Sequence, residues 1–227
     1  MRPLIEAALV VVPARDEQML LGACLDAVAL AAEQVDVPVM TVVVLDRCTD
    51  GTETVLHGRD VISIRTTVGC VGGARAAGVR EGLGRLSATR AARVWVVNTD
   101  ADSVVPQRWF THHLDQADGG ADLLLGTVDV AGAPVGLVSA WLTSYTAADG
   151  HPHVHGANLG VRASAYHRAG GFESVAVHED VRLATAVSAD PAAVVLRTAA
   201  APVVTSGRLV ARAPGGFAAH LRGLQAS

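Results

Sequence analysis

The feature that most constrains the fold is a short apolar run that ends in two closely spaced carboxylates. Residues 94–97 are Val, Trp, Val and Val, and Asp100 and Asp102 follow with one residue between them. A run without polar alternation is typical of a strand that is buried on both faces, as in parallel sheets. Open α/β sheets bind their ligands at the carboxyl ends of their strands. We therefore expect the two aspartates at a ligand-binding edge of a sheet.

Two interpretations of this aspartate pair remain open at this point. A divalent cation is one, because Mg²⁺ takes one or two protein carboxylates and completes its shell with substrate phosphates and water. The other is structural, because Asp also favours strand ends and the caps of helices. Pro106, which follows where a helix would begin, is compatible with both.

The strand at residues 94–97 is the fourth of a series. Each earlier apolar run is rich in β-branched residues and is followed by a stretch with helical spacing or by a glycine-rich loop. This alternation predicts an α/β fold, with a mostly parallel sheet flanked by helices and right-handed crossovers. The strands are expected at residues 8–12, 39–45, 61–65 and 94–97, and the helices at 19–31, 53–58 and 69–88.

The alternation becomes less regular after Pro106. The chain shows no internal repeat, low-complexity tract or linker, so residues 1–227 are predicted to form a single domain with halves at about 1–105 and 106–227. In the second half we expect strands at 121–130, 157–161, 193–197 and 203–206, and helices at 106–117, 135–147, 163–169, 178–188 and after Gly216.

Composition excludes some classes of protein. The chain is long enough to bury a sizeable core, with 50% apolar residues, and its net charge of −4 gives no general attraction to nucleic acid. All 18 basic residues are Arg, so any phosphate contact must use a guanidinium group. Three cysteines without metal-like spacing suit a reducing compartment and predict a cytoplasmic protein. The sequence lacks an apolar stretch long enough for a predicted transmembrane helix, which leaves peripheral membrane association as an alternative.

Three polar segments follow successive predicted strands, at residues 15–17, 46–52 and 100–103. In a parallel sheet these segments meet at one edge, beside the glycine-rich loop at residues 69–73. A helix that starts there offers its amino terminus to an anion, with Arg75 one turn along. The combination predicts a phosphate-bearing ligand, most simply a nucleotide, although taken singly Arg75 could be a solvated helix residue and Asp46 a turn residue.

In combination these segments resemble the motifs of family 2 glycosyltransferases. The order and spacing of the motifs fit over about residues 8–190. The matching segments are the Pro-x-x-Asp-Glu turn that contains Pro13, Ala14 and Glu17, the acidic turn Asp46–Thr52, the helix start Gly73–Gly78 with Arg75, the Asp-x-Asp pair Asp100 and Asp102, the acceptor-side segments 156–162 and 170–172, and the pair Glu179 and Asp180.

The resemblance implies a GT-A fold and a hexosyltransferase-like, inverting enzyme that uses a UDP- or GDP-sugar with Mg²⁺ or Mn²⁺. By position, Asp180 would be the base beside Glu179, and Asp102 would hold the metal with Asp100 in its shell or on the ribose. An alternative role for Asp180 is that of a helix cap. The nucleotide would contact Pro13, Ala14, Glu17, Asp46, Arg75 and Asp100, and the acceptor side would include Gly156, Asn158, Arg162 and His155. The acceptor itself would be a small molecule, a lipid-linked compound or a glycan.

The chain departs from the family pattern at two places. Leu45 stands where many members have the first Asp of a pair, and Arg47-Cys48 replaces Gly-Ser. The Gln/Arg-x-x-Arg-Trp motif of processive synthases is absent, which implies a single transfer. The alternatives are a sugar-phosphate nucleotidyltransferase and a nucleotide-sugar-binding protein without turnover. The alternating residues His151, His153 and His155 could share a face and reach a transition metal, or form an ordinary surface or substrate-facing loop.

Overall fold

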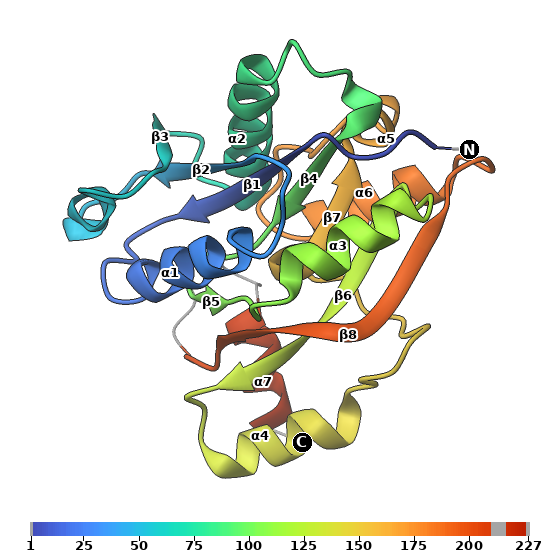
Figure 1. Cartoon of the computed structure of the whole chain (residues 1–227). Helices are drawn as coiled ribbons and strands as arrows, with labels where there is room; N and C mark the ends of the chain where they lie inside the picture. The colour runs from blue at the N-terminus through green and yellow to red at the C-terminus, as the bar shows by residue number, and fades with distance from the viewer. Residues whose placement is uncertain (1, 210–216, 226–227) are drawn as a thin grey trace.

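The computed structural model describes residues 2–209 and 217–225, and these residues build an eight-stranded sheet with helices on both faces (Figure 1). The strand order is β3-β2-β1-β4-β7-β6-β8-β5. The strands are β1 (Ala7–Ala14), β2 (Val39–Asp46), β3 (Ile62–Thr66), β4 (Val94–Asn98), β5 (Ser103–Val104), β6 (Leu123–Ala131), β7 (Leu159–Arg162) and β8 (Val195–Ser206). The α-helices are α1 (Leu21–Ala32), α2 (Val71–Arg85), α3 (Trp109–Asp118), α4 (Val135–Ser144), α5 (Ala163–Arg168), α6 (Glu179–Ser188) and α7 (Phe217–Gln225).

The first four strands form the parallel half that the sequence predicts. β1 pairs in parallel with β2 and β4, and β2 pairs in parallel with β3. Val10, Val43 and Val97 are fully buried, because helices cover both faces of these strands. The chain order reverses between β1 and β4, and such a switch point is where open α/β sheets form a ligand crevice. The predicted α/β class is confirmed.

Helix α2 packs unusually close to the sheet. A Cβ atom on Gly82 would lie 2.2 Å from Leu9 Cδ1, and one on Gly78 would lie 2.5 Å from Val11 Cγ1. Only residues without a side chain fit at these two positions, so the helix backbone rests directly on β1. This contact fixes where the first turn of α2 lies relative to the carboxyl end of β1.

The second half of the sheet is mixed. β7 pairs antiparallel with β4 and β6, whereas β8 pairs in parallel with β6 and antiparallel with β5. The prediction of two separate strands at 193–197 and 203–206 is wrong, because β8 is one continuous strand. Its register jumps where Thr198 pairs with Gly126 and Val203 pairs with Val128, so the alanine-rich stretch between them bulges without ending the strand.

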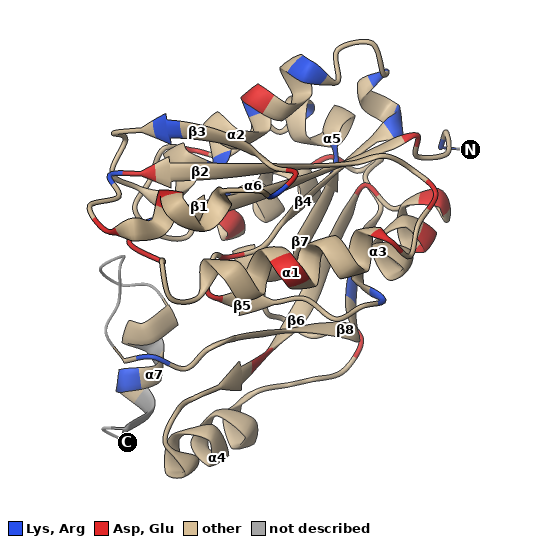
Figure 2. Cartoon of the chain, turned by 60° about the vertical axis from the view of Figure 1, so that its left-hand side comes forward, with Lys and Arg blue, Asp and Glu red and all other residues tan. Residues whose placement is uncertain are grey.

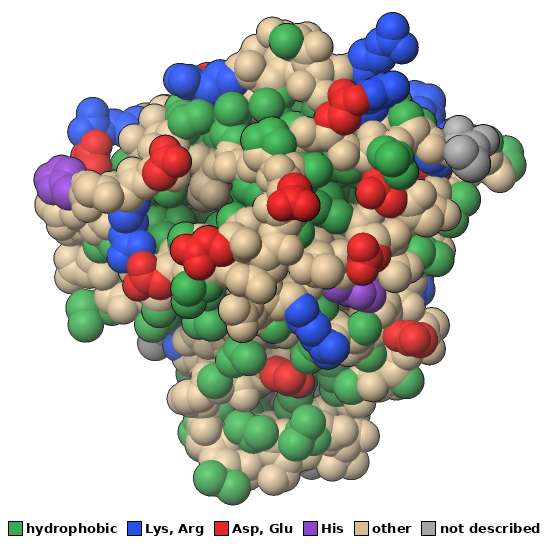
Figure 3. All heavy atoms as spheres, viewed as in Figure 1, with side chains coloured by type: hydrophobic (Ala, Val, Ile, Leu, Met, Phe, Trp, Pro, Cys, Tyr) green, Lys and Arg blue, Asp and Glu red, His purple; other side chains and the backbone are tan. Residues whose placement is uncertain are grey.

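The core has one layer on each face of the sheet. One cluster joins the sheet to α1 and α3 and contains the fully buried Trp95 and Trp109, and the other lies beneath α2, α5 and α6. In Figure 3 acidic and basic side chains are mixed over the visible face, without a broad basic area. Among the described residues, none of the helices combines the length and apolar character needed to span a bilayer.

Candidate active site

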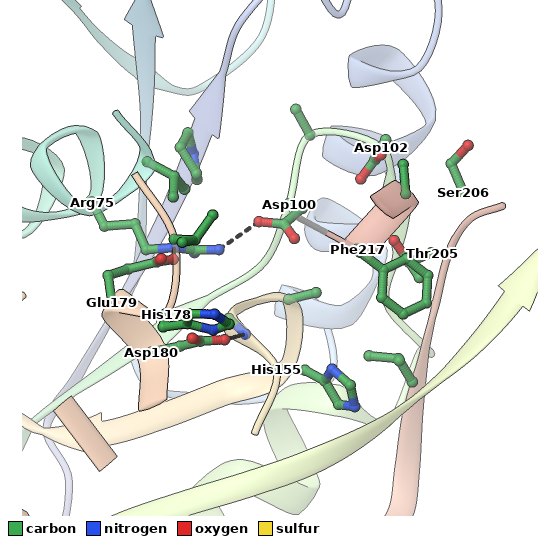
Figure 4. A pocket seen from close by; sticks show the side chains of 18 of the residues that line it. Arg75, Asp100, Asp102, His155, His178, Glu179, Asp180, Thr205, Ser206 and Phe217 are labelled. Carbon is green, nitrogen blue, oxygen red and sulfur yellow. Dashed lines mark hydrogen bonds and ion pairs between the residues drawn. The ribbon is translucent and has the colours of Figure 1, made fainter. Parts of the chain in front are cut away.

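A cavity of about 610 Å³ lies where β1, β2 and β4 end. The predicted polar segments meet there, at one edge of the sheet, and the segment before α6 faces them (Figure 4). Asp100 lies between Arg75 on one side and Asp102 on the other. The charged side chains among the described lining residues are six carboxylates and three guanidinium groups: Glu17, Asp46, Asp100, Asp102, Glu179, Asp180, Arg15, Arg75 and Arg208.

Arg75 is a buried residue of the cavity wall and not a solvated helix residue. Its side chain is 2% exposed, and its Nη2 donates to Asp100 Oδ1 at 2.5 Å while its Nε donates to Glu179 Oε1 at 3.1 Å. Its Nη1 is buried without a partner among the described residues. Gly156 makes room for the guanidinium, because a Cβ there would lie 2.5 Å from Nη2. Arg75 thus joins α2, the loop after β4 and the start of α6.

Glu179 and Asp180 open helix α6 and have different surroundings. Glu179 is 4% exposed, and burial raises its pKa while the charge of Arg75 opposes that shift. Asp180 lines the cavity, and its Oδ2 accepts a hydrogen bond from the Gly156 amide at 2.7 Å. Its Oδ1 accepts from the Val181 amide at 2.8 Å, so it also satisfies a donor at the helix end.

The residue at the N-cap of α6 is His178, not Asp180. The His178 backbone has φ 64°, a left-handed conformation that is uncommon outside glycine, and its side chain makes no capping hydrogen bond. His178 lines the cavity as well. A strained backbone at this point turns the chain so that Glu179 and Asp180 both reach the cavity.

Asp46 lies at the end of β2, as predicted, and holds the loop that leads into α2. Its Oδ1 accepts from Thr66 Oγ1 at 2.9 Å and from the Gly69 amide at 3.1 Å. Gly69 has φ +71°, which glycine adopts without strain. Asp46 is therefore a turn-forming residue that also lines the cavity beside Pro13 and Ala14.

Asp102 and Glu17 share an arginine that the sequence analysis missed. Arg208 Nη1 donates to Glu17 Oε2 at 2.6 Å, its Nη2 pairs with Glu17 Oε1, and Nη2 lies 3.0 Å from Asp102 Oδ2. Arg208 follows the end of β8, and the Ser206 amide donates to the Asp102 carbonyl at 3.2 Å, which brings the two segments together. Nothing in the sequence near Arg208 signals this pairing, because it depends on the path of the long strand β8.

The Asp-x-Asp pair fits a cation that takes further ligands from a substrate. Burial raises the pKa of Asp102 to about 6, and the charge of Asp100 adds to this shift while the charge of Arg208 opposes it. Among residues 2–209 and 217–225, no three His, Cys, Asp or Glu side chains are arranged as a complete metal site. Two carboxylates with an open side suit Mg²⁺ or Mn²⁺ that binds together with a diphosphate.

The other half of the cavity has an aromatic wall, made by Trp141, Tyr145, His153, His155 and Phe217. The Tyr145 ring stacks on Trp141 at 4.2 Å and on His153 at 4.1 Å between centroids. The Tyr145 hydroxyl accepts from the Val128 amide at 3.0 Å and lies 3.0 Å from His155 Nε2. Figure 2 shows no charged residue on α4, which carries Trp141.

The interpretation of the three alternating histidines as a metal site is not supported. Their Nε2 atoms already have partners: the Leu125 carbonyl for His151, the Thr146 amide for His153 and the Tyr145 hydroxyl for His155. The rings stack in sequence, with centroids 5.6 Å apart for His151–His153, and do not converge on one point. His153 and His155 belong to the cavity wall, whereas His151 is buried behind them and does not line the cavity.

Two residues predicted on the acceptor side lie in the protein interior. Asn158 is 1% exposed, accepts a hydrogen bond from Trp109 Nε1 at 2.9 Å and donates to two backbone carbonyls. Arg162 is 1% exposed and donates to backbone carbonyls, such as that of Ala92 at 2.6 Å. Neither residue is among those that line the cavity, whereas His155 and Gly156 do line it. Asn158 precedes β7 and Arg162 ends it, and the sequence does not indicate whether a polar residue at either end of a strand points into the cavity or into the interior.

Solved structures of similar fold include two that contain a nucleotide sugar. TarS of S. aureus (residues 1–349) in complex with UDP-GlcNAc aligns with a TM-score of 0.65 at 14% identity, over 92% of this chain and 61% of that one. The mannosyltransferase PcManGT from Pyrobaculum calidifontis, in complex with GDP-Man and Mn²⁺, aligns with a TM-score of 0.60 at 21% identity, over 96% of this chain and 60% of that one. The chain therefore spans about three-fifths of the length of these structures, and the predicted GT-A fold is confirmed.

The sequence itself identifies the family. A search of curated proteins gives no match. The family model described as "Glycosyl transferase family 2" matches residues 9–142, more than half of the chain, from β1 through the Asp-x-Asp pair to α4. The chain belongs to glycosyl transferase family 2.

Proposed function

We propose that this protein is an inverting glycosyltransferase that moves a sugar from a nucleotide-diphosphate sugar to an acceptor hydroxyl, once per binding event. The observation that supports it most is the content of one cavity: the Asp100 and Asp102 carboxylates, the buried Arg75–Glu179 pair and Asp180. These groups offer carboxylates that could hold a cation for the leaving diphosphate, and a carboxylate that could act as the base for the attacking hydroxyl.

The donor is proposed to lie along the ends of β1, β2 and β4. Arg75 Nη1, a buried donor without a partner among the described residues, is suited to a phosphate oxygen. Helix α2 is 15 residues long, and its first turn adds backbone amides and the positive end of the helix dipole. The nucleoside would lie against Pro13, Ala14, Glu17 and Asp46. The UDP-GlcNAc and GDP-Man complexes of the structural neighbours support a UDP- or GDP-sugar.

A divalent cation, Mg²⁺ or Mn²⁺, is proposed at Asp102 and Asp100. Six carboxylates and three guanidinium groups among the described lining residues leave the cavity negative, which disfavours a donor diphosphate without further positive charge. When bound, the cation would neutralise charge on the leaving diphosphate. The Mn²⁺ in the PcManGT complex with GDP-Man supports this proposal.

Asp180 is proposed to accept the proton of the acceptor hydroxyl. The Gly156 amide donates to Asp180 Oδ2, and Gly156 directly follows His155 of the aromatic wall, so Asp180 lies between the charged half of the cavity and that wall. Glu179 would position this segment through its ion pair with Arg75. A small-molecule, lipid-linked or glycan acceptor would approach along the wall that contains His155 and lies beside Gly156.

A donor screen with Mn²⁺ tests the proposal. UDP-, GDP- and other nucleotide sugars would be compared by thermal shift and by release of nucleoside diphosphate, first without and then with candidate acceptors. A ligand at 100 times its dissociation constant adds about 2.7 kcal/mol of stability, which such a screen detects. Pyrophosphate release from a nucleoside triphosphate and a sugar phosphate would favour the nucleotidyltransferase alternative. Donor binding without hydrolysis or transfer to any acceptor would favour a binding protein.

A further inference from the structure

Arg208 holds a positive charge next to Asp102, the carboxylate that is proposed to bind the cation. Its planar guanidinium contacts both carboxylate oxygens of Glu17 and, through Nη2, Asp102 Oδ2 at 3.0 Å. Two parallel N–H···O bonds to one carboxylate form the strong, oriented type of ion pair. The cavity therefore contains a side chain that can neutralise its acidic edge.

The position of Arg208 is held from two sides. Glu17, in the loop after β1, is 6% exposed as a side chain, Asp102 is 14% exposed, and Arg208 itself is 27% exposed. Charges in such partly buried surroundings are screened less than surface charges. The Ser206 amide also donates to the Asp102 carbonyl, so the backbone that carries Arg208 is tied to the segment that carries Asp102. A cation on Asp102 would lie close to this guanidinium and would be repelled by it.

We propose that Arg208 competes with the divalent cation for Asp102, and that the donor diphosphate relieves the competition by binding the guanidinium. Phosphate oxygens accept the same paired hydrogen bonds as a carboxylate. Arg208 can therefore replace its hydrogen bonds to Glu17 and Asp102 with hydrogen bonds to the donor diphosphate. The cation then binds weakly alone and tightly with the donor. This proposal rests on the proposed function and adds an order to it, in which cation and donor bind as a pair.

Arg15 offers a matched control for this competition. Arg15 lines the same cavity, but among the described residues it makes no ion pair with Glu17 or Asp102. Replacing Arg15 or Arg208 with Gln removes the same charge from the cavity. A difference between the two variants therefore reports the ion pairs of Arg208 with Glu17 and Asp102 and not the overall charge of the cavity.

Mn²⁺ binding measured by electron paramagnetic resonance and calorimetry tests the proposal on the full chain, without and with UDP or GDP. Without nucleotide, Arg208→Gln is expected to bind Mn²⁺ about 10-fold or more tightly than the unmodified protein, a typical size for coupling between two ligands. Arg15→Gln is expected to change the affinity by much less. Nucleotide should strengthen Mn²⁺ binding in the unmodified protein by a larger factor than in Arg208→Gln.

The outcomes separate this proposal from the proposed function. Equal Mn²⁺ affinity in Arg208→Gln and the unmodified protein, with nucleotide strengthening both alike, overturns the competition and leaves the cation-dependent transferase standing. Absence of Mn²⁺ binding in every folded variant, even with nucleotide, overturns both the metal assignment and the competition. Circular dichroism melting of each variant shows whether it is folded. Arg208→Lys, which keeps the charge but not the paired hydrogen bonds, should resemble the unmodified protein more than Arg208→Gln does.

Discussion

Arg75 Nη2 donates a hydrogen bond to Asp100 Oδ1 at 2.5 Å and ties the start of α2 to the loop after β4. The same guanidinium reaches Glu179, the neighbour of Asp180 in α6. One side chain thus connects the carboxylates proposed for the cation with the segment proposed to supply the base. A change on either side is expected to affect the other through Arg75.

Asp102→Asn is expected to abolish cation-dependent binding of UDP or GDP. The amide keeps the shape of the side chain but loses the charge that attracts a divalent ion. Calorimetric titration of nucleotide with and without Mn²⁺ measures the effect, and the melting temperature should stay within a few degrees. An unchanged nucleotide affinity in the presence of Mn²⁺ would remove Asp102 from the metal site.

Asp180→Asn is expected to lower turnover by about 10²- to 10⁴-fold, because the amide cannot accept the proton of the acceptor. Donor affinity should hardly change, since the proposed base would contact the acceptor and not the donor. Turnover, donor affinity and melting temperature are measured on the same variant. Asp190→Asn is a control, because Asp190 lies just beyond the other end of α6 and pairs with Arg168 outside the cavity.

Near-normal turnover in Asp180→Asn would contradict the base assignment. That result would indicate that the hydrogen bond from Asp180 to the helix end is its main role, because Asn satisfies a helix end nearly as well as Asp does. The assignment would then pass to Glu179.

Arg75→Met is expected to destabilise the fold by about 3–5 kcal/mol, because it leaves the buried Glu179 carboxylate without its partner. Denaturant unfolding measures the loss. The double variant Arg75→Met/Glu179→Gln should recover part of it, since the remaining group is neutral. Full additivity of the two single changes would contradict the importance of this pair.

Cation binding is expected to weaken as the pH falls through about 6. Burial and the charge of Asp100 raise the pKa of Asp102 from its ordinary value of 3.8 to about 6, and a protonated carboxyl is a poor metal ligand. Mn²⁺ titrations at a series of pH values measure the trend, and Asp102→Asn should show neither the affinity nor this pH dependence.

The same shift has the opposite effect on stability. The folded chain binds the Asp102 proton more tightly than the unfolded chain does. Protonated Asp102 therefore raises the free energy of unfolding, fully so when the pH is below the ordinary pKa of 3.8, and this contribution is lost as the pH rises through about 6. Comparing the pH dependence of unfolding in Asp102→Asn with that of the unmodified protein isolates this contribution.

The sequence predicted the parallel half well because its signals are local. A run such as residues 94–97 has few options besides a buried strand, and strand ends then place Asp46 and Asp100 at one edge. Arg208 could not be predicted, because its contact with Asp102 depends on the course of β8. Asn158 and Arg162 were placed wrongly for a related reason: a motif gives their positions along the chain but not the direction of their side chains. The mixed pairing among β6, β7 and β8 likewise depends on contacts between segments that are distant in the sequence.

The glycines at positions 78 and 82 let α2 touch β1, and Arg75 lies about one turn before Gly78 on that same helix. A methyl group at either glycine would act as a spacer that lifts the helix and carries the guanidinium away from Asp100 and Glu179. Libraries that aim to change the proposed donor or acceptor preference of this protein should therefore leave both positions untouched, although neither lines the cavity. The position of the Arg75 guanidinium in the site therefore depends on the absence of a Cβ atom at Gly78 and Gly82.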